Sequence, residues 1–322
     1  MKSHWKKLGL AGMAGVLALS AQLAGAKEST VGYVAAGMQY PFNVAAARGF
    51  EAAAKEAGVK TVVLDAKTSV ERQGNAVDDL IAQKVDGIAV LPIDAVVAQS
   101  WVDRAAARNI PVVAVATQIG DPQKHPIKVV YPKLAGLVAS DEVRAGADAA
   151  QIAARLLPKD RVAKIAIVEG APGYPTVWQA TKGFKDGLEK AGIKYQVVAS
   201  QPTDWTPEQG ESVCQNILTA HPDVDLFYNQ ADDMVIGCAR AVRAAGSHAK
   251  LVSRGGSKLG INAIKTGDVD GTVCIQPGKM GRLAFKTLYA AITNPGAPKG
   301  KFVDVDTPQV TKTSLSACVP EW

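Results

Sequence analysis

Two kinds of segment alternate along the chain from residue 27 onward: short runs of β-branched residues and longer, Ala-rich amphipathic stretches. The short runs are almost wholly apolar, as strands buried on both faces of a parallel sheet must be. The expected strands are Thr30–Ala36, Val59–Asp65, Gly87–Pro92 and Pro111–Ala116, and the helices between them lie near Asn43–Ala57, Val70–Gln83 and Val96–Arg108. This order predicts a βαβ series with right-handed crossovers.

The alternation then stops and starts again. Gly120–Lys133 contains three prolines and predicts an extended loop, after which a helix is expected over Asp141–Leu157. The second series comprises strands at Val162–Val168, Lys194–Ala199, Asp225–Asn229, Lys250–Ser253 and Gly271–Gln276, and helices near Pro175–Ala191, Pro207–Ala220, Asp232–Ala245 and Lys279–Thr293. One module used twice predicts an α/β protein with two open parallel sheets and a ligand crevice where their strand ends face each other.

The N-terminus indicates export. Lys2, Lys6 and Lys7 precede an apolar run over 8–23, which ends in Ala24-Gly25-Ala26 before Lys27. This is the pattern of a signal peptide, 1–26, with the mature chain starting near Lys27. The run of about 16 residues is short for a membrane span, which needs roughly 20. No Cys stands at the cleavage point, so a lipid anchor is disfavoured.

The mature chain has the size of two domains. Removing 26 of 322 residues leaves 296, and the formal net charge of +6 falls to about +3 because the leader carries three Lys and no acidic residue. A chain with 48% hydrophobic and 20% charged residues has an ordinary soluble composition. Neither the net charge of the mature chain nor its composition favours a nucleic-acid partner.

The cysteines suggest disulfides. All four lie in the last third of the chain, at Cys214, Cys238, Cys274 and Cys318. An even number in an exported chain indicates two bridges, although four cysteines allow three pairings. The preferred pairing joins Cys214 to Cys238 and Cys274 to Cys318. A zinc site, for which no CxxC or close His spacing exists, and four buried free thiols are the alternatives.

Catalysis is not expected. The mature sequence contains no GxSxG elbow, no Walker loop and no GxGxxG after a strand. No His–carboxylate or Cys–His constellation appears, so neither an enzyme nor a cofactor or metal is predicted.

Several motifs resemble one family. The most specific are Ala199–Trp205, Gln215–Val224 and Gln230–Met234, and they are accompanied in the expected order by Tyr40-Pro41-Phe42, Ser140-Asp141-Glu142 and Ile165–Phe184. They resemble type I periplasmic sugar-binding proteins of the ribose-binding kind, over essentially the whole mature chain. The resemblance implies two Rossmann-like lobes joined by a three-strand hinge. It also implies lobes of 27–139 with 276–303 and of 140–275 with 304–322, connected near Ser140, Ile275–Gln276 and Asp304.

The resemblance implies a function as well. It predicts a monomeric periplasmic protein that binds a small molecule between its lobes and delivers it to an ABC permease in the inner membrane. A ligand sensor for a chemoreceptor or sensor kinase uses the same fold and stays open as an alternative. An exported enzyme is a further alternative, for which no catalytic group is visible.

Some positions match the ligand residues of the family. Phe42 and Trp205 fall on pocket aromatics, and Gln276 falls at or beside a hinge glutamine. Tyr40 stands where the family has Asn, and Asn43 replaces a second aromatic.

Other positions depart from the family. Its sugar-clamping Asp-Arg pair is Ala116-Thr117 here, and Trp178 replaces an Arg, Ala231 an Asn and Gly255 an Asp. Because ionised partners make the stronger hydrogen bonds, losing them implies a roomier, less polar pocket. Ribose is therefore disfavoured, and a polyol, a modified sugar, a cyclitol or a small aromatic compound is favoured. The expected ligand-binding residues are Tyr40, Phe42, Asn43, Thr117, Gln118, Trp178, Trp205, Asp233, Arg254 and Gln276.

Two further acidic residues have expected structural roles. Asp141 is interpreted as a hinge or helix-cap residue, and Asp232 as the N-cap of a helix that begins at Asp233.

Overall fold

The computed structural model describes residues 29–296 and 298–322, together with Met1. Apart from that first residue, the predicted signal peptide and the expected start of the mature chain at Lys27 lie outside the described residues. Within the described part, no helix has both the length and the apolar character needed to cross a membrane.

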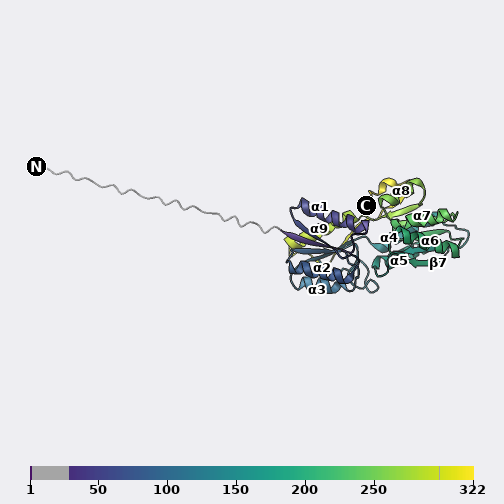
Figure 1. The fold of residues 1–322 in the computed structure, drawn as a ribbon. Coiled ribbons are helices and arrows are strands. Elements are labelled where there is room, and N and C mark those ends of the chain that lie inside the picture. Colours follow the sequence, from purple (N-terminus) through teal and green to yellow (C-terminus); the bar gives the residue numbers. More distant parts are fainter. Residues whose placement is uncertain (2–28, 297) are drawn as a thin grey trace.

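Two six-stranded sheets form the centres of two lobes, which Figure 1 shows side by side. The first sheet has the order β2-β1-β3-β4-β5-β11, and the second has the order β7-β6-β8-β9-β10-β12. The strands of the first sheet are β1 (Thr30–Ala35), β2 (Lys60–Asp65), β3 (Gly87–Val90), β4 (Val112–Val115), β5 (Gly136–Ala139) and β11 (Lys301–Asp304). Those of the second are β6 (Ala163–Glu169), β7 (Tyr195–Pro202), β8 (Leu226–Asn229), β9 (Lys250–Gly255), β10 (Gly271–Cys274) and β12 (Gln309–Thr311). The shared order confirms that one α/β module is used twice.

The strands are parallel with one exception. In the first sheet Val34 of β1 lies between Leu64 of β2 and Val90 of β3, in register with both. β12 runs antiparallel to β10 at the edge of the second sheet. The sequence did not indicate β5, a four-residue strand that follows the Pro-rich loop, nor α8 (Lys258–Thr266), a nine-residue helix.

The helices begin where local residue chemistry favours a start. α1 (Pro41–Glu56), α5 (Pro175–Lys190), α6 (Pro207–Ala220) and α9 (Pro277–Thr293) each open on a proline, whose fixed φ and missing N–H suit the first helical position. The remaining helices are α2 (Val70–Ala82), α3 (Ala98–Ala106), α4 (Glu142–Leu156) and α7 (Asp232–Ala244). The Asp141 side chain accepts a hydrogen bond from Arg144 N, which confirms its expected role as a cap, here of α4.

Glycines let α1 and α9 approach each other closely. A Cβ added at Gly281 of α9 would lie 1.9 Å from the carbonyl oxygen of Ala46 in α1, and one at Gly49 would lie 2.0 Å from Gly278 O. Neither distance is possible, so only glycine permits this contact. It fixes α1 against α9 in the first lobe.

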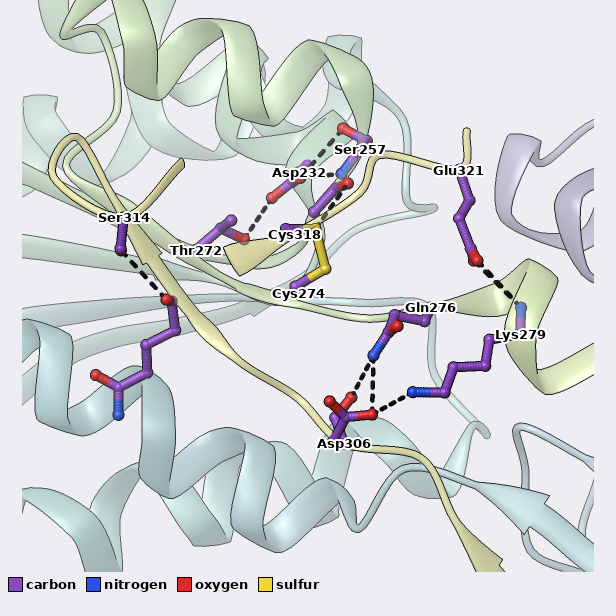
Figure 2. The surroundings of a disulfide bond; sticks show 12 residues. Asp232, Ser257, Thr272, Cys274, Gln276, Lys279, Asp306, Ser314, Cys318 and Glu321 are labelled. Carbon is purple, nitrogen blue, oxygen red and sulfur yellow. Dashed lines mark hydrogen bonds and ion pairs between the residues drawn. A yellow bond between two sulfur atoms is a disulfide. The ribbon is translucent and has the colours of Figure 1, made fainter. Parts of the chain in front are cut away.

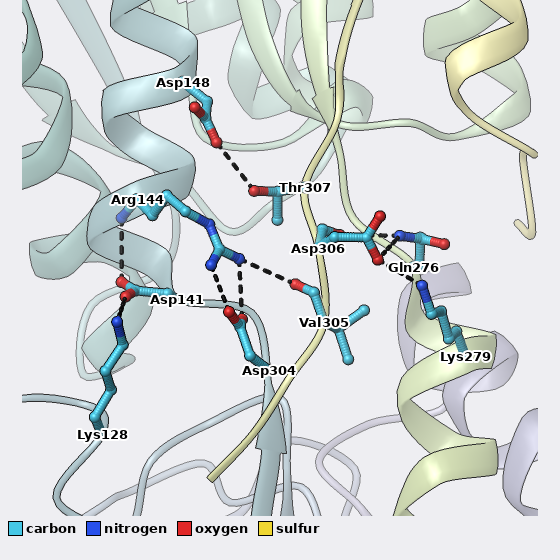
Figure 3. Close-up of polar contacts among 10 residues, drawn as sticks. All are labelled: Lys128, Asp141, Arg144, Asp148, Gln276, Lys279, Asp304, Val305, Asp306 and Thr307. Carbon is cyan, nitrogen blue, oxygen red and sulfur yellow. Dashed lines mark hydrogen bonds and ion pairs between the residues drawn. The ribbon is translucent and has the colours of Figure 1, made fainter.

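The chain passes between the sheets three times, after β5, after β10 and after β11. Polar contacts join these crossings, as Figure 3 shows. Arg144 forms a bidentate ion pair with Asp304 and donates to Val305 O at 3.4 Å. Gln276 Nε2 donates to the Asp306 carbonyl at 2.9 Å. These contacts link three segments that any relative movement of the lobes would have to bend.

Two disulfides are present, with the pairing that the sequence analysis preferred. Cys214–Cys238 joins α6 to α7, and Cys274–Cys318 joins the end of β10 to the C-terminal segment. Because all four cysteines are in disulfides, the two alternatives, a zinc site on these cysteines and four buried free thiols, are excluded.

Candidate ligand-binding cleft

A cavity of about 320 Å³ lies between the lobes. Its walls come from segments at the carboxyl ends of strands in both sheets, the edge where open α/β sheets bind their ligands. Seven of the ten expected ligand-binding residues line it: Tyr40, Phe42, Asn43, Thr117, Trp205, Asp233 and Arg254. The volume is at the lower end of the range for small-molecule sites.

Three expected residues do not line the cavity. Trp178 is 45% exposed, because it lies two residues beyond Thr176 on α5 and helical rotation turns it away from the cleft. Gln118 is buried between the lobes, where it donates to His125 O at 2.9 Å and accepts from Gln179 Nε2 at 2.9 Å. Gln276 is held by Asp306 at the hinge.

Trp205 forms a fixed aromatic wall. A Cβ at Gly170 would lie 1.7 Å from its ring, so the indole lies directly on that glycine. Its backbone has φ of 71°, a left-handed conformation that is uncommon for a bulky residue and that often marks a functional position. The ring also meets the Tyr174 ring edge-on, with centroids 6.0 Å apart. The ring is thus oriented by contacts within its own lobe.

Tyr174 is a cavity residue that the sequence analysis missed. It precedes Pro175 at the start of α5 just as Tyr40 precedes Pro41 at the start of α1, so the repeated module was a usable signal. Burial raises the pKa of both phenols, to about 12 for Tyr174. Both hydroxyls therefore stay protonated at neutral pH.

The turn after β4 is unusual. Thr117 N donates to Val115 O at 2.6 Å, and the residue between them, Ala116, has φ of 61°. A three-residue turn with positive φ is rare and strained, and such strain is typical of ligand clamps. The turn places Ala116 and Thr117, the two residues for which the resemblance implies an Asp-Arg pair, at the cavity wall.

A buried ion pair forms another part of the wall. Arg254 Nη2 donates to Glu142 Oε1 at 2.6 Å, and the two residues are 9% and 2% exposed. Glu142 Oε2, Arg254 Nε and the hydroxyl of Thr176, another cavity residue, are buried without a protein partner. Since buried polar atoms are normally paired, these atoms are suited to hydrogen bonds with a polar ligand. Glu142 and Thr176 were not among the expected site residues.

Two amide side chains are used within their own lobes. Gln230 Oε1 accepts from Gly170 N at 3.0 Å, and its Nε2 donates to Val177 O and to the Thr181 hydroxyl. Asn43 Nδ2 donates to Gly37 O at 2.7 Å. Both residues therefore hold the cavity loops in place.

Asp232 lies behind the cavity rather than at a helix cap. α7 begins at Asp232 itself and Ala231 is the N-cap, which corrects the expected N-cap assignment. The fully buried carboxylate accepts from the hydroxyls of Ser253 and Thr272 and from the backbone and side chain of Ser257.

The same carboxylate accounts for one departure from the family. A Cβ at Gly255 would lie 2.4 Å from Cγ of Asp232. Any side chain at that position would collide with Asp232, so the aspartate that the family has there has no room.

Asp233 should make stability depend on pH. Burial, with the charge of Asp232, raises its pKa to about 6 in the folded protein. An aspartate with a raised folded pKa stabilises the protein fully below its unfolded value near 3.8, and that stability is lost as pH rises through 6. Asp233→Asn should therefore be more stable than wild type by up to about 3 kcal/mol at pH 8, and equal to it near pH 4. Urea denaturation across this range measures the difference, and a constant difference contradicts the assignment.

Comparisons with known proteins agree with this architecture. The family model of the periplasmic binding protein domain matches residues 31–296. The ribose import binding protein of Bacillus subtilis is 32% identical over 258 residues, which is 80% of each chain. A xylitol-binding protein of Mycolicibacterium smegmatis is 30% identical and covers 84% of this chain and 74% of its own length. The crystal structure of the Caulobacter myo-inositol binding protein has a TM-score of 0.80 at 26% identity, covering 91% of this chain and 96% of that one.

The chain belongs to the periplasmic binding proteins. Within that family it is a type I sugar-binding protein of the ribose-binding kind. The fold and the family predicted from the sequence are thereby confirmed.

Proposed function

We propose that this chain is exported to the periplasm and binds a small polyol, modified sugar or cyclitol between its lobes for an ABC importer. The observation that carries the proposal is the make-up of the cavity. Aromatic rings from both lobes line it, among them Phe42, Tyr174 and Trp205, beside buried polar atoms without protein partners. Polyhydroxylated ligands offer C–H faces to such rings and hydroxyls to such atoms.

The polar wall favours hydroxyl groups in particular. Glu142 Oε2 accepts hydrogen bonds, Arg254 Nε donates them, and the Thr176 hydroxyl does both. A ligand hydroxyl can both donate and accept a hydrogen bond, so hydroxyl groups alone can pair with all three of these atoms. The similar proteins are named for ribose, xylitol and myo-inositol, and each of these compounds carries several hydroxyl groups. Ala231 and Gly255 stand where the family places ionic or amide partners, so ribose is the weaker candidate.

A small aromatic compound is the second candidate, because of the number of rings in the wall. The partner in the proposal is an inner-membrane permease that recognises the closed, liganded monomer. Recognition of the same form by a chemoreceptor or sensor kinase is the alternative.

A thermal unfolding screen tests the ligand class. The protein is titrated with D-ribose, D-allose, xylitol, myo-inositol and, as the aromatic probe, benzoate. A ligand that binds only the native state at 100 times its Kd stabilises it by about 2.7 kcal/mol. We expect xylitol or myo-inositol to give the largest increase in the unfolding midpoint. An increase with benzoate alone, or with none of the five, contradicts the proposal.

A further inference from the structure

The last five residues, 318–322, form a segment that we call the strap. It begins at Cys318, which is bridged to Cys274 at the end of β10, and Trp322 O accepts a hydrogen bond from Lys258 N at 2.8 Å. Cys274 and Lys258 belong to the second lobe. The strap is therefore anchored at both ends to that lobe, and Figure 2 shows its course past the disulfide.

Between those anchors the strap reaches the first lobe. The Glu321 carboxylate accepts from Gly278 N at 2.7 Å and from Lys279 N at 3.2 Å, in the first turn of α9 (Figure 2). Pro277 has no N–H, so these are the first two backbone donors of the helix. A carboxylate at a helix N-terminus is favourable. It accepts hydrogen bonds from backbone N–H groups that have no partner within the helix, and its negative charge interacts favourably with the positive end of the helix dipole. Glu321 thus connects the two lobes beside the hinge.

Trp322 lies in the wall of the cavity. Its ring meets that of Phe42 from the first lobe edge-on, with the ring centroids 5.6 Å apart and the planes at 90°. Its indole nitrogen Nε1 is buried and has no protein partner. An indole N–H can only donate a hydrogen bond, so a ligand group that pairs with it has to be an acceptor, such as an oxygen.

We infer that Trp322 is a specificity-determining residue of the cleft, which donates its indole N–H to an acceptor oxygen of the ligand. Glu321 is the positioning residue that holds the strap against the first lobe. The inference rests on the proposed function, because it assigns a further contact of the same ligand. It also predicts that lobe closure and strap contact occur together, since the strap is fixed to one lobe and touches the other.

Calorimetry with xylitol and myo-inositol tests the ligand contact. Trp322→Phe keeps an aromatic ring beside Phe42 but loses the N–H together with the five-membered part of the indole, so the affinity should fall about tenfold. Trp322→Ala removes the wall as well and should lower it roughly 30-fold or more. The matched control is Trp178→Ala, an exposed tryptophan outside the cavity, for which we expect a change within about twofold. Unchanged affinity in Trp322→Phe, with unchanged circular dichroism, overturns the inference, because phenylalanine has no N–H to donate.

Amide hydrogen exchange tests the strap without any ligand. In Glu321→Ala the amides of Gly278 and Lys279 should exchange at least about tenfold faster than in wild type, because they lose their acceptor. The control is Glu71→Ala, which removes an exposed glutamate from the first turn of α2. If neither xylitol nor myo-inositol binds wild type, the proposed ligand class is wrong. The hydrogen-exchange result then still tests, by itself, whether Glu321 holds the strap against α9. Equal exchange in Glu321→Ala and wild type overturns the strap contact.

Discussion

Replacing Trp205 with alanine should weaken ligand binding by roughly 30- to 1000-fold. The indole forms a wall of the cavity, and its position is fixed by the contact with Gly170 and by the edge-on contact with Tyr174. Truncating a buried aromatic contact of this kind costs about 2–4 kcal/mol, and each 1.4 kcal/mol is a factor of ten in affinity. Isothermal calorimetry with the compound that stabilises wild type most gives the ratio directly.

Trp178→Ala is the matched control for this experiment as well. Sequence reasoning placed Trp178 in the pocket, whereas the structure leaves it 45% exposed and outside the cavity. Circular dichroism of both variants checks that they fold. A large loss of affinity in Trp178→Ala with none in Trp205→Ala would contradict the cavity described here.

Replacing Asp232 with alanine should lower the free energy of unfolding by about 3–5 kcal/mol. Its carboxylate accepts hydrogen bonds from Ser253, Ser257 and Thr272, and all of these groups are buried. Removing the acceptor leaves several buried donors unpaired and opens a cavity. The cost resembles that of removing one partner from a buried charge pair.

Urea denaturation measures this loss. Asp223→Ala serves as the control, because Asp223 is exposed and its ion pair with Lys164 lies at the surface; a change within about 0.5 kcal/mol is expected there. An Asp232→Ala protein as stable as Asp223→Ala would show that the buried network does not stabilise the second lobe.

The fold was predictable because its signals are local and repeated. Apolar runs such as Val112–Val115 indicate buried parallel strands wherever they occur, and the repetition of the series indicated two sheets. β5 was missed because its four residues follow a long Pro-rich loop. The antiparallel β12 was missed because strand direction at a sheet edge depends on the hinge, which no local pattern encodes.

The site was predictable where a residue directly follows a strand. Trp205 and Thr117 lie in such segments and reach the cavity. Trp178 does not, because a change of two positions along a helix turns a side chain by about 200°. Gln118 also follows a strand, but its side chain is held by hydrogen bonds with Gln179 and with His125 O and does not line the cavity.

Long-range contacts were beyond sequence reasoning. Trp322 reaches the cavity only because the Cys274–Cys318 disulfide and Glu321 place it there. Glu142 belongs to the cavity through its ion pair with Arg254, which lies 112 residues away in the chain.

Small-angle scattering with and without ligand tests whether a solute is captured between two hinged lobes. The cavity has walls from both lobes, so a bound ligand should draw the lobes together about the crossings near Ser140, Gln276 and Asp304. The protein is measured alone and saturated with the compound that gives the largest stabilisation. We expect a smaller radius of gyration in the saturated protein. Identical scattering curves, with binding proven by calorimetry on the same sample, would contradict it.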